Sequence, residues 1–208
     1  MPEVSVVIPC ADYHDGMVGR ALASCEAQTT PCRALVQRDP VGYGAGWARN
    51  KALRRAVTPL VLFLDADDEL APDAIETMLA AYEAQPSRYV YSDWQSGGQV
   101  YAAPDEAFVL PEPQVHLVSA LMPTGWALQI GAFDTSLPYF EDTDFYLKLR
   151  YLGGWQGQRV ARPLVTYAAH GERSAQAFVG DGLLSAAALK VRQSIYARYT
   201  WAWEPARQ

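Results

Sequence analysis

The sequence predicts an α/β fold in a single domain, with a mostly parallel central sheet flanked by helices. Two observations indicate this class. Over the first hundred residues, short runs of β-branched and apolar residues alternate with segments whose apolar residues recur at helical spacing. The chain has 208 residues, of which 50% are hydrophobic, and this is enough to bury one core of ordinary size.

The first half supplies the clearest elements. Residues 4–8 are β-branched and end at Pro9, and residues 60–64 are apolar throughout, so both runs predict strands buried on both faces. Pro72 suits the first turn of a helix whose apolar residues share one face. In order, we expect strands at 4–8, 33–37, 60–64, 89–91 and 100–101, and helices at 17–27, 47–56 and 72–84.

The second half reads differently. Residues 102–115 contain three prolines and little periodicity, which predicts a long ordered loop. After this loop, the apolar patterns predict helices at 115–121, 141–152 and 182–199, and short strands at 126–130, 160–161 and 164–167.

Composition excludes several classes of protein. The net charge of −6 argues against a nucleic-acid binder that relies on its overall field. No apolar run approaches the ~18 residues of a membrane-spanning helix, and no basic segment precedes the first apolar run, so we expect neither an anchor nor a signal peptide. Three cysteines without a C-x-x-C pattern suit a reducing compartment, so we expect a cytoplasmic protein.

A cluster of carboxylates follows the apolar run at 60–64. Asp65 and Asp67 are two residues apart, so on an extended chain they face a common point. Two carboxylates ~4 Å apart repel by about 4 kcal/mol at an effective dielectric constant near 20, and a cation relieves this repulsion. Oxygen ligands favour Mg²⁺, Mn²⁺ or Ca²⁺ over Zn²⁺. The alternative is a solvated acidic turn that caps the next helix.

Polar groups also follow the first two strands. Residues 9–12 and Arg38-Asp39 stand at strand ends, where open α/β sheets bind their ligands. The turn Gly44-Ala45-Gly46 opens a helix that carries Arg49, and free N–H groups beside an arginine suit a phosphate. The turn does not match the dinucleotide motif G-x-G-x-x-G, and the alternative for its glycines is close packing of helix on sheet.

Four segments together resemble the family 2 glycosyltransferases, which have the A-type nucleotide-diphospho-sugar transferase fold, GT-A. They occur in the family's order and are residues 4–9, 46–52, 63–68 and 140–145. Residues 131–134 resemble the segment that precedes the family's catalytic acidic motif. The resemblance extends from residue 4 to about residue 175.

The resemblance implies roles for individual residues. Asp142 matches the general base of the family's Glu-Asp motif, although acids are also common in the first turn of a helix. Asp67 would bind Mn²⁺ or Mg²⁺, with His170 completing the metal shell; the alternative for His170 is an ordinary surface histidine. The residues assigned to the nucleotide-sugar donor are Pro9, Asp39 at the base, Arg49 near the diphosphate or ribose, Asp65 at the ribose, Ala66 and Asp67.

The resemblance also implies an organisation and shows departures from it. We expect one domain over 1–208, with a donor-binding half at 1–100, an acceptor and catalytic half at 101–180, and a C-terminal helix at 181–208. Cys10-Ala11-Asp12 replaces the family's usual Thr-Tyr-Asn, and Arg38-Asp39-Pro40 replaces Asp-Asp-Gly-Ser. Nine residues separate Asp39 from Arg49, so a helix and a strand usual in the family are missing. The chain is a short variant.

The implied activity is the inverting, metal-dependent transfer of a sugar from a nucleoside-diphosphate sugar, most simply a UDP-sugar, to an acceptor hydroxyl. Two alternatives stand beside it. One is a sugar nucleotidyltransferase, which would carry a basic, glycine-rich loop after the first strand that residues 10–16 lack. The other is a catalytically silent sugar-nucleotide-binding protein. The acceptor and the oligomeric state are left open by the sequence.

Overall fold

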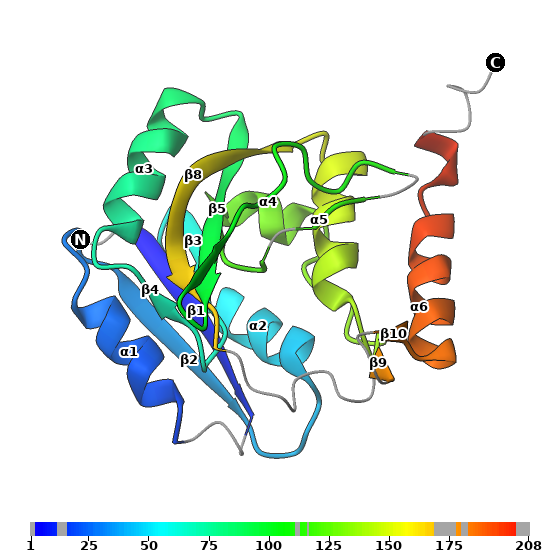
Figure 1. Ribbon diagram of the computed structural model, residues 1–208, viewed down its shortest axis with the longest axis horizontal. Helices are drawn as coiled ribbons and strands as arrows, with labels where there is room; N and C mark the ends of the chain where they lie inside the picture. The colour runs from blue at the N-terminus through cyan, green and yellow to red at the C-terminus, as the bar shows by residue number, and fades with distance from the viewer. Residues whose placement is uncertain are drawn as a thin grey trace.

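The computed structural model describes residues 3–11, 16–110, 113–115, 117–168, 178–179 and 183–202 (Figure 1). The strands are β1 (Val4–Ala11), β2 (Arg33–Asp39), β3 (Leu60–Phe63), β4 (Glu69–Leu70), β5 (Arg88–Ser96), β6 (Gln99–Tyr101), β7 (Ala120–Pro123), β8 (Gln156–Thr166), β9 (Phe178–Val179) and β10 (Leu183–Leu184). The helices are α1 (Val18–Glu26), α2 (Ala45–Leu53), α3 (Ala74–Ala84), α4 (Thr124–Gln129), α5 (Glu141–Tyr151) and α6 (Ala186–Ala197), followed by a 3₁₀ turn at Thr200–Ala202.

The main sheet has the strand order β2-β1-β3-β7-β5-β8-β4, with β6 paired to β5. β1 lies parallel to β2 and β3, as the alternating pattern predicts. β7 enters between β3 and β5 antiparallel to both, and β4 and β6 are also antiparallel to their neighbours. The α/β prediction is therefore confirmed, but the sheet is mixed rather than mostly parallel. Helices lie between the parallel strands β1, β2 and β3, and α4 and α5 lie between the parallel strands β5 and β8. The antiparallel strands β7, β4 and β6 make the sheet mixed.

Each face of the sheet has its own core. Along β1, Val4, Val6 and Ile8 join the layer that α1 and α3 cover, whereas Val7 joins the opposite layer with α2, α4 and α5. The residues of β3 alternate in the same way, and all four are buried. Apolar side chains on both faces explain why these strands are continuous hydrophobic runs in the sequence.

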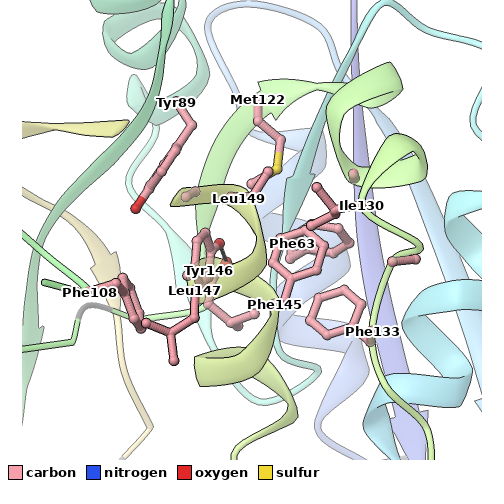
Figure 2. Close-up of a cluster of buried hydrophobic side chains, with 14 of the residues drawn as sticks. Phe63, Tyr89, Phe108, Met122, Ile130, Phe133, Phe145, Tyr146, Leu147 and Leu149 are labelled. Atoms are coloured by element: carbon pink, nitrogen blue, oxygen red, sulfur yellow. Dashed lines mark hydrogen bonds between the residues drawn. The ribbon is translucent and has the colours of Figure 1, made fainter. Parts of the chain in front are cut away.

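Aromatic rings fasten α5 to β3. Figure 2 shows Phe145 of α5 beside Phe63 of β3 and Phe133 of the preceding loop. The ring centroids of Phe145 and Phe133 are 4.2 Å apart in a stacked pair, and Phe63 meets both edge-on at 5.0 and 5.5 Å. Such pairs add about 0.5–1.5 kcal/mol each to the burial of the rings themselves. The start of α5 is thus held next to the end of β3.

A buried carboxylate ties α6 to α5. Asp144 is fully buried, and its Oδ1 accepts hydrogen bonds from the Arg198 guanidinium and the Tyr199 hydroxyl, both at 3.0 Å. Lys148, one turn further along α5, lies 3.3 Å from Oδ2. Arg198 also pairs with Asp134 at 2.9 Å. The end of the described chain therefore supports the same helix that carries Asp142.

Two predicted elements are wrong. The helix expected at 115–121 is absent from the described residues of that range: residues 117–119 are irregular and lead into strand β7, whose residues Ala120, Leu121 and Met122 are fully buried within the sheet. The strand expected at 126–130 is instead part of helix α4, where Ala127 and Ile130 are buried while the two residues between them are exposed. The short strands expected at 160–161 and 164–167 are one strand, β8, with an irregular register beside Asp93.

The remaining predicted helices and strands are present with shifted ends. The described residues 102–110 and 113–115 contain no helix or strand, as the predicted long loop requires. A membrane-spanning helix is absent from the residues that the structure describes. The division into donor-binding and acceptor-binding halves at residues 100 and 180 stays a prediction.

Candidate active site

The candidate site lies at the edge where β1, β2 and β3 end. Ala11, the last residue of β1, is level with Asp39, the last residue of β2. Leu64 continues the ladder beyond β3 by donating its N–H to the carbonyl of Val7 at 3.0 Å. Asp65 therefore follows β3 at the carboxyl-terminal edge of three parallel strands, where open α/β sheets bind ligands, and β1 and β2 continue four residues beyond the level at which β3 ends.

Arg49 joins the two sides of this site. Its guanidinium donates to Asp65 Oδ1 at 2.7 Å and to Glu141 Oε1 at 2.8 Å, and its side chain is only 5% exposed. The guanidinium carbon also lies 5.2 Å from the centre of the Phe133 ring. Burial disfavours the charged form, but the two carboxylates outweigh it and raise the pKa of Arg49. Both terminal nitrogens are thus engaged by protein carboxylates.

Arg49 reaches both Asp65 and Glu141 because α2 lies close to α5, and two glycines permit this close approach. Gly44 precedes the helix with φ +98°, a conformation that favours glycine. A Cβ on Gly46 would lie 3.3 Å from Cγ of Glu141, so a glycine permits this contact. Asn50 then holds Phe133 by accepting from its N–H at 2.9 Å and donating to its carbonyl at 2.8 Å.

Asp142 lies half-buried at the start of α5, next to Glu141. Burial, and then the negative charge of Glu141, raise the pKa of Asp142 to about 6, while Arg49 acts in the opposite direction. Asp65 also raises this pKa, so Asp142 and Asp65 lie within electrostatic reach of each other. The structure therefore brings together Arg49, Asp65 and Asp142, three residues that the sequence assigns to one site.

Asp67 and Asp68 follow Asp65 in the turn after β3, and each is about 1% exposed. Asp68 accepts a hydrogen bond from the backbone N–H of Ala168 at 3.0 Å, which ties this turn to the end of β8. Burial, and then the charge of Asp65, raise the pKa of Asp68 to about 8. The turn after β3 is thus an enclosed cluster of acids with excess negative charge.

Asp39 is turned toward its own loop. Its Oδ1 accepts from the N–H of Gly42 at 3.0 Å and its Oδ2 accepts from the N–H of Gly44 at 2.7 Å. The carboxylate therefore shapes the connection between β2 and α2, and its predicted contact with a nucleotide base stays a prediction. Pro9 is buried in β1, level with Gln37 of β2, and Ala66 is 1% exposed between the two acids of the motif.

The predicted metal ligands are only partly described. His170 lies outside the described residues. Within the part of the chain that the structure describes, no group of three or more histidine, cysteine or acidic side chains is arranged to hold a metal ion. The assignments of Asp67 and His170 stay predictions.

Glu141 is the site residue that sequence reasoning missed. Its side chain is 21% exposed and pairs with Arg49, which is 92 positions earlier in the chain. The available signal was its place in the acidic run Glu141-Asp142-Thr143-Asp144, directly before the predicted base.

Comparison with known proteins shows what this chain resembles. The family model described as "Glycosyl transferase family 2" matches residues 15–103, which include Asp39, Arg49 and the acids after β3. Over these residues the chain is similar to glycosyltransferase family 2. An uncharacterized glycosyltransferase of Haemophilus influenzae is 28% identical over 152 residues, which are 67% of this chain and 52% of the relative. The chain thus spans about half the length of that relative.

Solved structures show the same GT-A-type fold. Residues 1–349 of S. aureus TarS, in complex with UDP-GlcNAc, superpose with a TM-score of 0.74 at 18% identity, covering 94% of this chain and 65% of that TarS fragment. The mannosyltransferase PcManGT of Pyrobaculum calidifontis, in complex with GDP-Man and Mn²⁺, has a TM-score of 0.62 at 16% identity. That alignment covers 83% of this chain and 58% of PcManGT.

Proposed function

We propose that this protein is an inverting, divalent-metal-dependent glycosyltransferase that moves a sugar from a nucleoside-diphosphate sugar, most simply a UDP-sugar, to an acceptor hydroxyl. The observation that carries the proposal is the pair of ion pairs through Arg49. They join Asp65, on the predicted donor side, to Glu141, whose neighbour Asp142 is the predicted base. The match of residues 15–103 to the family 2 model and the nucleotide-sugar complexes of TarS and PcManGT support it.

In this scheme Asp142 acts as the general base. Its carboxylate takes the proton from the acceptor hydroxyl as the oxygen attacks the anomeric carbon from the face opposite the leaving diphosphate, which inverts the configuration. A pKa of about 6 suits this role, because the group is mostly ionised at pH 7 yet more basic than an ordinary aspartate. Arg49 orients Asp65 and Glu141 through its two hydrogen bonds.

The residues after β3 fit a divalent cation. Mg²⁺ and similar ions are commonly held in enzymes by one or two carboxylates, with substrate phosphates and water supplying the other ligands. The enclosed acids there, with the raised pKa of Asp68, match that kind of site. Asp67 would hold the ion, with Asp65 beside it and His170 as a predicted further ligand. Such an ion would neutralise charge on the leaving diphosphate, so no protein acid is required.

The test combines donor binding with turnover. A thermal-shift screen of UDP-, GDP- and dTDP-sugars with Mn²⁺ identifies the donor, since a bound ligand stabilises the fold by mass action. Release of the nucleoside diphosphate is then measured over an acceptor panel for the native protein and for Asp142→Asn. We expect the variant to bind the donor as the native protein does and to lose transfer by at least ~10²-fold.

Several outcomes would contradict the proposal. Full transfer by Asp142→Asn would reject the assignment of the base. Donor binding without turnover across the acceptor panel would favour a silent binding protein. Pyrophosphate release from a nucleoside triphosphate and a sugar phosphate would favour a nucleotidyltransferase.

A further inference from the structure

The short connection between β2 and α2 presents an exposed pair of aromatic rings. Tyr43 is 58% exposed, although tyrosine rings are usually at least half-buried in folded proteins. Its ring centroid lies 4.9 Å from that of Trp47, at an interplanar angle of 35°. Trp47, in the first turn of α2, is itself contacted by the Lys51 ammonium at 5.6 Å. Tyr43 therefore stands at the surface with a second ring packed against it.

Asp39 fixes the backbone on both sides of Tyr43. The amides of Gly42 and Gly44 donate to the two oxygens of its carboxylate. Both glycines have positive φ, +83° and +98°, so the bends that project the intervening side chain are built into the sequence. A preorganised ring loses little conformational entropy when a ligand stacks on it, which favours binding.

The position of Tyr43 follows from the topology. β3, β1 and β2 present their carboxyl ends at one edge, whereas β7, on the other side of β3, runs in the opposite sense. Because ligands lie at carboxyl ends, a nucleotide whose diphosphate is at Asp65 extends across β1 toward β2. Across the sheet, two strand spacings of ~4.8 Å cover about 10 Å, a distance that a ribose and a base can span. Along the strands, β2 continues four residues beyond the level at which β3 ends, so its end projects past β3 at this edge. Tyr43 stands four residues beyond the end of β2.

We infer that Tyr43, supported by Trp47, stacks on the nucleobase of the donor. This inference rests on the proposed function and adds how the base is recognised. Each oxygen of Asp39 accepts one backbone hydrogen bond that shapes the loop, and the Tyr43 ring adds a stacking contact to the base. Every base has an aromatic face, so recognition by stacking discriminates poorly between uracil and guanine.

The experiment measures Mn²⁺-dependent binding of UDP, GDP and inorganic pyrophosphate by isothermal titration calorimetry. The proteins are the native chain, Tyr43→Ala, Tyr43→Phe and a control, Tyr101→Ala, which removes another exposed tyrosine ring, one stacked on Trp94 in the β5–β6 hairpin. We expect Tyr43→Ala to weaken UDP and GDP alike by about 5- to 150-fold, the measured range for base–aromatic stacking. Pyrophosphate, which has no base, is expected to bind all four proteins equally. Tyr43→Phe keeps the ring and is expected to bind like the native protein.

The outcomes separate this inference from the proposed function. If Tyr43→Ala binds UDP as tightly as the native protein does, the stacking role is wrong and the donor site stands. Equal weakening of pyrophosphate and UDP would mean that the ring only supports the loop, which also rejects the inference. If the native protein binds neither nucleotide with Mn²⁺, the donor site itself is rejected, and the inference with it.

Discussion

Replacing Arg49 tests whether the site is one rigid unit. Arg49→Met keeps most of the side-chain volume and removes both ion pairs, to Asp65 and to Glu141. Arg49→Lys keeps the charge, but a single ammonium group cannot replace the planar guanidinium, whose two terminal nitrogens each bond a different carboxylate. The two variants therefore separate loss of charge from loss of geometry.

The expected cost follows from the burial of the three groups. Net contributions of hydrogen bonds to charged groups are about 1.5–3 kcal/mol each, so the two bonds of 2.7 and 2.8 Å suggest roughly 3–6 kcal/mol. The carboxylates of Asp65 and Glu141 are 27% and 21% exposed, so water recovers part of this loss. We expect Arg49→Met to lower the free energy of unfolding by about 3 kcal/mol and Arg49→Lys by roughly half as much.

The assay is urea denaturation followed by tryptophan fluorescence, with Arg162→Met as the matched control. Arg162 pairs with Asp73 at 2.9 Å, but the two side chains are 55% and 39% exposed. Exposed pairs contribute only about 0–1 kcal/mol. A double-mutant cycle of Arg49→Met with Glu141→Gln should show a coupling energy above about 1 kcal/mol. If Arg49→Met lowers the free energy of unfolding no more than Arg162→Met does, Arg49 does not hold Asp65 and Glu141 together.

Three further outcomes are expected. The kcat/KM for transfer should fall about tenfold per pH unit below the Asp142 pKa of about 6, and Glu141→Gln should move this limb to lower pH because it removes a charge that raises the pKa. Because the pKa of Asp68 is about 8 in the fold and ordinary in the unfolded chain, the metal-free native protein should lose stability from pH 5 to pH 8. Asp68→Asn should be the more stable protein at pH 8, by roughly 1–4 kcal/mol in urea denaturation, and about equal at pH 4. Gly157→Ala would place a Cβ 2.5 Å from the Tyr91 ring and should lower the melting temperature at a cost of about 1–3 kcal/mol, whereas Gly125→Ala, with open space around it, should not destabilise.

The strands that carry the site could be predicted because their signal is local. The runs that form β1 and β3 are buried on both faces, so they are apolar except for Ser5, and Asp65 follows closely on the second run. β1 itself continues past Pro9 to Ala11. The acids after β3 and Asp142 could be assigned by type and order along the chain. The structure then brings Asp142 within electrostatic reach of Asp65.

The features that could not be predicted depend on tertiary contacts. A run such as Ala120-Leu121-Met122 is apolar whether it forms a buried helix or a buried strand, and its place between β3 and β5 decides the outcome. The partnership of Arg49 with Glu141 spans 92 positions and has no local signature. The commitment of Asp39 to two backbone amides likewise appears only once the following loop has folded.

The attachment of α6 to α5 has a practical consequence for anyone who shortens this protein. Residues 186–202 lie on the opposite side of the molecule from α1 (Figure 1), so a shortened protein could be designed without them. Removing them would take Arg198 and Tyr199 away from Asp144 and leave its buried carboxylate with Lys148 as its ion-pair partner among the described residues. A protein truncated before residue 198 would therefore hold α5, the helix that carries Asp142, less firmly, and its loss of turnover would say nothing about acceptor recognition.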